Sequence, residues 1–407
     1  MTCVGIDWAD ETHQVCILDE QGRTLDSFGI AHGRKGFELA HAKIAKYSAP
    51  AEVRVAIETR DSLFVDFLLE LGYALYFLNP KQTNRLRDRY RMSDSKSDAF
   101  DAYVLADAVR RDPEFFNALS ALDELSLRLR LLTRTREGLV GRKVAVVNEI
   151  TAHLKRYFPV ARELFGGVDN AQTIAFLLQY PTYEQARTVS EGRITALLVK
   201  QAKISPAIAA RHAARARALL KEPQASPSAS VTRAYPCAVK SLLRQLQSIL
   251  VELDALDAEI AHNYKDHPNK ELLDSLPGVA GTLGPVLAAE LGADVQRFAG
   301  LRALKAFAGT CPVTKQSGKW HSIHIRRACN GHVRRALHLA SRSALRSTRW
   351  ARELFDRLRR EGKSYGRSLR AVGDQLIEIL YVLLLRRVRY DETYHLRMKA
   401  LHGKTCS

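Results

Sequence analysis

The sequence predicts a mixed α/β domain at the N-terminus and a mostly helical remainder. Before Asp112-Pro113, short segments of alternating apolar and polar residues are interleaved with helical patterns, whereas after it leucines recur at helical steps of three and four. The charge is also uneven, because residues 297–407 hold 25 Lys and Arg against 7 Asp and Glu, and the rest of the chain holds 37 of each. We therefore expect an α/β domain at 1–113, a helical region at 114–265, a basic domain at 266–350 and a basic helical tail at 351–407.

The N-terminal domain is predicted from the order of its elements. Three alternating segments, with a turn at 20–23 between the second and third, indicate a three-stranded meander, and helices and strands then alternate. The order β-β-β-α-β-α-β-α is that of an RNase H-like nuclease fold. The expected elements are strands Val4–Asp7, His13–Leu18 and Thr24–Ile30, helix Gly36–Tyr47, strand Val53–Glu58, helix Leu63–Leu71, strand Ala74–Leu78 and a helix around Ser95–Arg111.

Four carboxylates stand where this fold would bring them together: Asp7, Glu58, Asp98 and Asp101. The first two end neighbouring strands, and the last two lie three residues apart on one helix, so that both project from one face. Carboxylates this close repel one another unless a cation neutralises them, and Mg²⁺ prefers hard oxygen ligands. The sequence therefore predicts a catalytic site for two Mg²⁺ ions about 4 Å apart.

Each of these acids taken alone has an ordinary interpretation. An aspartate at a strand end commonly forms a turn, and Asp98 could instead cap its helix. Asp94, in a serine-containing loop, is the neighbour most easily mistaken for a member of the set. The prediction depends on the four positions occurring together.

Two leucine-rich repeats predict a pair of long helices in the middle of the chain. The first is interrupted by Arg136 and Lys143, and the second makes a narrow apolar stripe suited to coiled-coil pairing. We expect an antiparallel helical arm that contributes to contacts in a homodimer or tetramer; packing of the two helices on each other within one chain is the alternative. The repeat positions are Leu122, Leu125, Leu129, Leu132, Leu139, Val146 and Ile150, then Leu242, Leu246, Ile249, Leu253, Leu256 and Ile260.

A long part of the C-terminal region contains no acidic residue. Between Val295 and Arg352 there are 13 Lys and Arg and four His. Charge confined to one region is typical of proteins that bind a polyanion such as nucleic acid. A membrane surface would favour an uninterrupted basic amphipathic helix, and Gly and Pro interrupt this segment, so we expect no membrane partner.

The segment Leu276-Pro277-Gly278-Val279 is the first motif of this region. It lies between two short predicted helices and resembles a helix-hairpin-helix, whose turn amides hold a phosphate. Ala280 replaces the usual second glycine of that motif. A structural helix turn is the alternative.

A single serine in a predicted basic loop, Ser317-Gly318-Lys319, is the second motif. Its hydroxyl is a candidate nucleophile toward phosphorus, because cations nearby would stabilise the charge that develops on the phosphate; a mere phosphate contact is the alternative. Cys311, His321, His324 and Cys329 raise a zinc alternative, although their spacing fits no common finger. The candidate nucleic-acid-binding residues are Lys315, Gly318, Lys319, Arg326, Arg327, Arg334 and Arg335.

The sequence also predicts a compartment. No signal peptide is evident, and the longest apolar run, around Leu376–Leu385, is too short to span a bilayer. Six cysteines are scattered without paired spacing. We therefore expect the protein to lie in a reducing cytoplasm. A nucleic-acid-binding protein of a bacterium would there be associated with the nucleoid.

Taken in order, these motifs resemble those of the DEDD transposases of insertion sequence family 110, over nearly the whole chain. The motifs are VGIDWAD around Asp7, AIET at Glu58, KSDAFDA around Asp98 and Asp101, and AGTCPVTKQSGK, followed by Arg326-Arg327 and by Gly331 before Arg334-Arg335. The resemblance implies an N-terminal RuvC-like domain that carries the metal-binding tetrad and a C-terminal transposase domain in which Ser317 is the functional serine. Gln316 stands where many relatives have a second serine, which leaves one candidate.

The same resemblance implies an activity and partners. Members of the family move DNA through a circular intermediate and insert it site-specifically, guided by a structured non-coding RNA that pairs with donor and target DNA. Their site is composite, with the carboxylates of one subunit meeting the serine of another. A junction-resolving or structure-specific metal-dependent endonuclease and a nucleic-acid-binding scaffold with an inactive site are the alternative functions.

Overall fold

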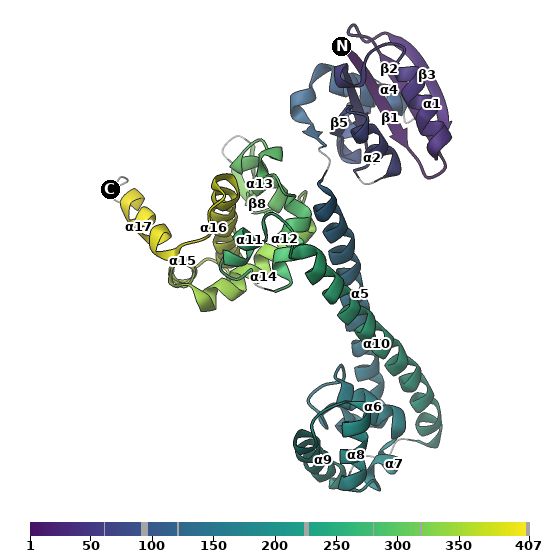
Figure 1. Cartoon of the computed structure of the whole chain (residues 1–407), viewed down its shortest axis with the longest axis vertical. Helices are drawn as coiled ribbons and strands as arrows, with labels where there is room; N and C mark the ends of the chain where they lie inside the picture. Colours follow the sequence, from purple (N-terminus) through teal and green to yellow (C-terminus); the bar gives the residue numbers. More distant parts are fainter. Residues whose placement is uncertain are drawn as a thin grey trace. The chain divides into compact units, whose positions relative to one another are not determined.

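The computed structural model describes residues 1–60, 62–90, 97–119, 122–223, 228–279, 281–317 and 320–403. The chain divides into two compact units, Met1–Leu122 and Asp123–Ser407 (Figure 1). The first unit is mixed α/β and the second is mostly helical, as predicted. In the part of the chain that the structure describes, no helix combines the length and apolarity needed to cross a membrane. The four-part domain division remains a prediction.

One mixed sheet forms the centre of the first unit, with strand order β3-β2-β1-β4-β5-β6. Strand β1 pairs antiparallel with β2 and parallel with β4, so the predicted three-stranded meander and the predicted pairing of the first strand with the fourth are confirmed. The strands are β1 Thr2–Trp8, β2 Thr12–Leu18, β3 Thr24–Ala31, β4 Val53–Ile57, β5 Ala74–Phe77 and β6 Asn117–Ala118. This arrangement agrees with an RNase H-like fold.

Helices cover both faces of this sheet. Helices α1 (Arg34–Ile44) and α2 (Leu63–Glu70) pack with Val4 and Ile6 of β1 in one core. Helix α4 (Asp98–Arg111) packs on the opposite face, where Cys3 shares a core with residues of α4. A Cβ on Gly5 would lie 1.9 Å from the Ala102 carbonyl oxygen, so only glycine allows α4 to lie this close to β1.

Helix α3 (Pro80–Arg87) was not predicted. Asn79-Pro80 follows shortly after β5 and begins this helix: the Asn79 side chain accepts from Lys81 N in a capping box, and proline stands in the first turn. The helix is mostly polar, so it has no apolar periodicity from which it could be recognised.

In the second unit, helices α5 (Glu124–Tyr157) and α10 (Ala229–Tyr264) run antiparallel along each other (Figure 1). The two residues that interrupt the first repeat form ion pairs: Arg136 Nη2 lies 3.0 Å from Asp257 Oδ2 of α10, and Lys143 lies 2.8 Å from Asp169. The helices therefore pack on each other within one chain, which was the alternative interpretation of the repeats. Contacts between subunits remain a prediction.

Two hydrophobic cores form at opposite ends of this helix pair. One contains Ile150 and Leu154 of α5, Val239 and Leu246 of α10, and the helices between them. The other contains Leu129 of α5, Ile260 of α10 and the C-terminal helices. The helices of the first core are α6 Ala171–Gln179, α7 Tyr183–Arg187, α8 Glu191–Gln201 and α9 Pro206–Lys221.

The C-terminal core is built from short helices and carries one hairpin. Its elements are α11 Lys270–Ser275, α12 Leu283–Leu291, α13 Leu301–Ala308, β7 Val313–Ser317, β8 Trp320–His324, α14 Gly331–Ser347, α15 Arg349–Arg360, α16 Tyr365–Arg386 and α17 Glu392–Gly403. The region after residue 350 is helical, as predicted, and Trp350, Leu376 and Leu380 belong to the same core as α12 and α14.

The predicted helix-hairpin-helix turn lies between α11 and α12. Gly278 has a φ of +80°, and a Cβ there would lie 2.2 Å from the Ala340 carbonyl oxygen of α14. This glycine therefore allows close packing on α14, which supports the structural interpretation of the turn. Ala280 lies outside the described residues.

Candidate active site

Asp7 and Glu58 follow the last paired residues of two neighbouring parallel strands. Ile6 of β1 is paired with Ile57, the last residue of the parallel strand β4. Asp7 is the next residue of β1, and Glu58 is the first residue after β4. Both side chains are partly exposed.

Asp98 and Asp101 occupy the first turn of α4, which packs against β1. Ser97 is the N-cap, and its hydroxyl accepts from Phe100 N at 3.3 Å. The alternative role of Asp98 as the cap is therefore wrong. Asp98 is exposed, whereas Asp101 is only 1% exposed.

The buried carboxylate oxygens of this region are short of hydrogen bonds. Among the described residues, Glu58 Oε1 and both oxygens of Asp101 are buried without a hydrogen-bond partner. The charge of Asp101 is balanced by an ion pair with the guanidinium of Arg87, at the end of α3. Buried carboxylate oxygens without hydrogen-bond donors are suited to bind a cation, because burying a negative charge without compensation is energetically unfavourable.

These residues fit a divalent metal in their chemistry and only partly in their present positions. All four are oxygen donors, as Mg²⁺ prefers. Among the residues that the structure describes, however, no three His, Cys, Asp or Glu side chains converge closely enough to hold a metal ion. Arg87 neutralises one of the predicted ligands in this arrangement. The same finding gives no support to the zinc alternative at 311–329.

Ser317 is the last residue of β7, not part of a loop as predicted. Strands β7 and β8 pair antiparallel, with Ser317 opposite Trp320 and Lys315 opposite Ser322. No local pattern predicts this hairpin, because neither strand has an apolar face. Ser317 is exposed, as a residue that attacks a substrate must be.

The predicted nucleic-acid-binding cations do not all have free side chains. Lys315, Arg327 and Arg334 are exposed. Arg326 Nε donates to the Cys311 carbonyl oxygen at 3.2 Å, and this hydrogen bond links the segment before β7 to the segment after β8. Arg335 forms an ion pair with Glu137 of α5. Gly318 and Lys319 lie outside the described residues, and the binding of nucleic acid by the whole set remains a prediction.

Sequence reasoning missed a serine–histidine pair on the hairpin. Ser322 Oγ and His324 Nε2 are 2.7 Å apart. Because paired residues and every second residue of a strand share a face, this pair lies on the same face as Ser317. Which residues of the two strands share a face with Ser317 can be read only once the pairing of the strands is known.

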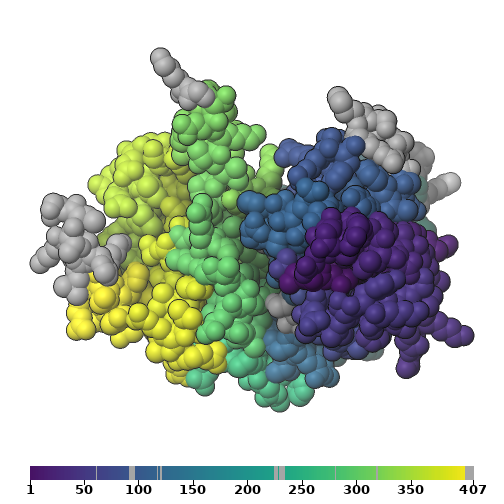
Figure 2. Space-filling model, turned by 90° about the horizontal axis from the view of Figure 1, so that it is seen from above, coloured from purple at the N-terminus to yellow at the C-terminus, as the bar shows by residue number. Residues whose placement is uncertain are grey.

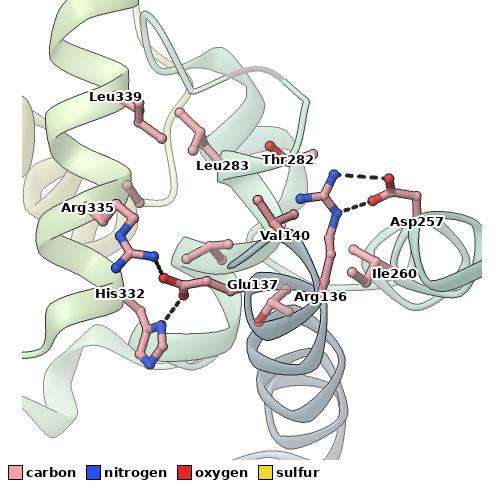
Figure 3. Close-up of a pocket in the computed structure, with 13 residues that line it drawn as sticks. Arg136, Glu137, Val140, Asp257, Ile260, Thr282, Leu283, His332, Arg335 and Leu339 are labelled. Atoms are coloured by element: carbon pink, nitrogen blue, oxygen red, sulfur yellow. Dashed lines mark hydrogen bonds and ion pairs between the residues drawn. The ribbon is translucent and has the colours of Figure 1, made fainter. Parts of the chain in front are cut away.

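A small cavity lies between α5, α10, α12 and α14, with a volume of about 180 Å³. Figure 3 shows Arg136 against Asp257 on one side of it and Glu137 against His332 and Arg335 on the other. Apolar side chains such as Val140, Leu283 and Leu339 line the space between. The cavity is smaller than those that hold small-molecule ligands, roughly 300–1,000 Å³, and its ion pairs connect α5 to its neighbours.

Comparison with known proteins identifies the family. Residues 4–159 match the IS110-type DEDD family model, described as a transposase, and residues 270–356 match the model described as the transposase IS116/IS110/IS902 family. The chain is 29% identical to the mini-circle putative transposase for IS117 of Streptomyces coelicolor, over 95% of each chain. It is 27% identical to the insertion element IS110 uncharacterized 43.6 kDa protein of the same organism, over 79% of this chain and 78% of that one, and 34% identical to the putative transposase y4uE of Sinorhizobium fredii, over 48% and 55%. The chain therefore belongs to the IS110 family of insertion-sequence transposases, enzymes that cleave and join DNA.

Proposed function

We propose that this transposase moves its insertion sequence through a circular intermediate, with Mg²⁺ held by Asp7, Glu58, Asp98 and Asp101 and with Ser317 as the nucleophile. The observation that carries this proposal is that Asp7 and Glu58 directly follow the paired residues Ile6 and Ile57 of the parallel strands β1 and β4, while α4, whose first turn holds Asp98 and Asp101, packs against β1. The RuvC-like assignment of residues 1–113 and the transposase-domain assignment of 266–350 belong to the same proposal.

Membership of a DEDD family implies dependence on a divalent metal ion. When bound, the metal would polarise the phosphate and offset the charge that develops during an in-line displacement. The protein itself would contribute by holding the carboxylates in fixed positions. Asp7 is held by the pairing of β1 with β2, Glu58 directly follows the paired end of β4, and α4, which carries Asp101, lies in close contact with Gly5.

The serine step exchanges one phosphoester bond for another. A bond forms between Ser317 Oγ and phosphorus as the bond from phosphorus to a deoxyribose oxygen breaks; the serine loses its proton and the leaving sugar oxygen gains one. Lys315, on the same face of the hairpin, would offset the charge on the phosphate. Attack by a hydroxyl of another DNA end then restores the serine, so joining needs no ATP.

We further propose a structured non-coding RNA as guide and a homodimer or tetramer with composite sites. The location of the carboxylates and the serine in separate compact units supports a site shared between subunits. The guide RNA follows from the resemblance to the family, and the formal net charge of +18 suits the binding of any polyanion, DNA or RNA. Sequencing the RNA that crosslinks to the protein in cells would test the guide: one dominant transcript from the element's own ends is expected, and a random sample of cellular RNA would contradict it.

Junction PCR in cells that carry the gene with its native flanking DNA tests the chemistry. Circles are expected with the wild type and should fall below detection with Ser317→Ala and with Asp7→Ala. If Ser317→Ala still produces circles, the serine is a phosphate contact and the carboxylates act alone, as in a nuclease. Normal circles with Asp7→Ala would refute the metal site.

Arg87→Gln is expected to tighten divalent metal binding by about tenfold, which corresponds to roughly 1.4 kcal/mol. The guanidinium of Arg87 is paired with buried Asp101, and this ion pair must break before Asp101 can bind a metal. Titration calorimetry of the full-length protein with Mg²⁺ measures the change. Arg85→Gln, an exposed arginine of the same helix, is the matched control. Unchanged or weaker affinity in Arg87→Gln would show that Arg87 does not compete with the metal.

A further inference from the structure

The hairpin β7–β8 presents a large aromatic side chain beside the candidate nucleophile. Trp320 is directly opposite Ser317 in the strand register, so the two side chains share one face. Lys315, two residues before Ser317, lies on that face as well. Figure 2 shows the green part of the chain that includes the hairpin standing out from the surface as a ridge.

Trp320 is unusually exposed for its residue type. Its exposed fraction is 56%, whereas Trp350 of the same unit is completely buried and donates its indole N–H to the Tyr390 hydroxyl at 2.9 Å. A tryptophan in water leaves a large apolar surface unburied, which is common in side chains that stack on a ligand.

The charge around the hairpin indicates which ligand would cover the indole. No acidic residue occurs between Val295 and Arg352, and the hairpin and the residues after it carry Lys315, His321, His324 and Arg327 as exposed basic or titratable side chains. A second copy of this surface would be repelled by the like charge, whereas a nucleic-acid strand offers phosphates for the cations and flat bases for the indole.

We propose that Trp320 stacks on a nucleobase of the DNA strand and thereby holds the adjacent phosphate at Ser317. The placement at the reacting phosphate rests on the proposed function of Ser317, whereas the stacking itself requires only that the hairpin binds DNA. Stacking on an unpaired base makes single-stranded or locally opened DNA the favoured ligand. Trp320 is then a positioning residue of the transposase.

The test measures binding of the full-length protein to a fluorescein-labelled single-stranded 20-mer of mixed sequence, at fixed salt with EDTA to prevent cleavage. Trp320→Ala is expected to weaken binding by about tenfold, or ~1.4 kcal/mol, and Trp320→Phe, which keeps a ring, by much less. Ile323→Ala is the matched control, because Ile323 is 54% exposed on the opposite face of the same hairpin, and it should bind like the wild type.

Tryptophan fluorescence supplies a second readout that a purely structural role would not change. An unlabelled strand should quench the wild type, and the quenched component should be absent in Trp320→Phe. Equal affinity of Trp320→Ala and the wild type, with no quenching assigned to Trp320, would overturn the proposal. A change of oligomer mass in Trp320→Ala without a change in DNA affinity would also overturn it, since the face would then contact a second copy.

These measurements are independent of the serine chemistry. If Ser317→Ala still produces circles but Trp320 is quenched by DNA, the nucleophile assignment fails and the stacking stands. If Ser317→Ala abolishes circles while Trp320→Ala binds normally, the nucleophile stands and the stacking fails.

Discussion

Replacing Gly5 with alanine is expected to displace α4 from the sheet and to abolish transposition. The new methyl group would lie 1.9 Å from the Ala102 carbonyl oxygen and 2.5 Å from Ala106 N. Both atoms belong to the helix backbone, so no side-chain rotation can relieve the overlap. Overpacking of this kind costs roughly 3 kcal/mol, and the shift would carry Asp101 away from Asp7 and Glu58.

Hydrogen exchange in the full-length protein would measure this effect, as faster exchange in the β1 and α4 segments together with a lower melting temperature. Gly29→Ala is the matched control. Gly29 is an exposed glycine of β3 in the same sheet, and the nearest atom to its added methyl group would be Gln14 Oε1 at 3.5 Å. Normal exchange and normal circle formation in Gly5→Ala would contradict the close contact between α4 and β1.

Glu290→Gln is expected to destabilise the C-terminal core by about 3 kcal/mol, because it leaves arginines near a buried site without their counter-charge. Glu290 of α12 is completely buried. Its Oε1 accepts from Arg134 Nε of α5 at 2.9 Å, and Arg130 lies nearby. Its Oε2 accepts from Asn330 Nδ2 at 2.7 Å, and Asn330 caps α14. One carboxylate therefore joins three helices.

The same residue makes stability depend on pH. Burial alone would raise the pKa of Glu290, but the hydrogen bond from Arg134 and the charges of Arg130 and Arg134 outweigh it, so its pKa lies below the ordinary value of 4.5. Stability from this charge is therefore present above pH 4.5 and is lost as the pH falls through the lowered pKa.

Thermal unfolding from neutral to acid pH would test both statements. The gap in melting temperature between Glu290→Gln and the wild type should be several degrees at pH 7 and should narrow as the pH falls below 4.5 through the lowered pKa of Glu290. Glu124→Gln, which removes an exposed ion pair with Arg128, should show neither effect. A gap that persists in acid would mean that Glu290 stabilises the core through its shape and not through its charge.

The parts of the fold that sequence could predict are those with apolar periodicity. The meander, the helices of the first unit and the long pair α5 and α10 all bury one face, so alternation or heptad spacing marks them. The pairing of the first strand with the fourth was predicted from the order of the elements, and the register shows it up to Ile6 and Ile57. The convergence of Asp7 and Glu58 just beyond that pair remains a prediction.

The parts that could not be predicted lack such a pattern. Helix α3 is mostly polar, and its Arg87 reaches Asp101 only through the tertiary fold. The hairpin β7–β8 is exposed on both faces, so the positions of Trp320 and of the Ser322–His324 pair beside Ser317 depend on a register that no local signal fixes. The pairing of Arg335 with Glu137, 198 residues apart, likewise follows from packing alone.

The antiparallel pair of α5 and α10 has a consequence for how this transposase can evolve. The chain leaves the C-terminal core along one helix and returns to it along the other, so everything between them is attached at a single place. Residues 160–269 lie between the two segments that match the family models. A lineage can lengthen, shorten or exchange the distal module of α6 to α9, or an engineer can graft a new recognition domain there, while the C-terminal core and the hairpin that carries Ser317 keep their packing.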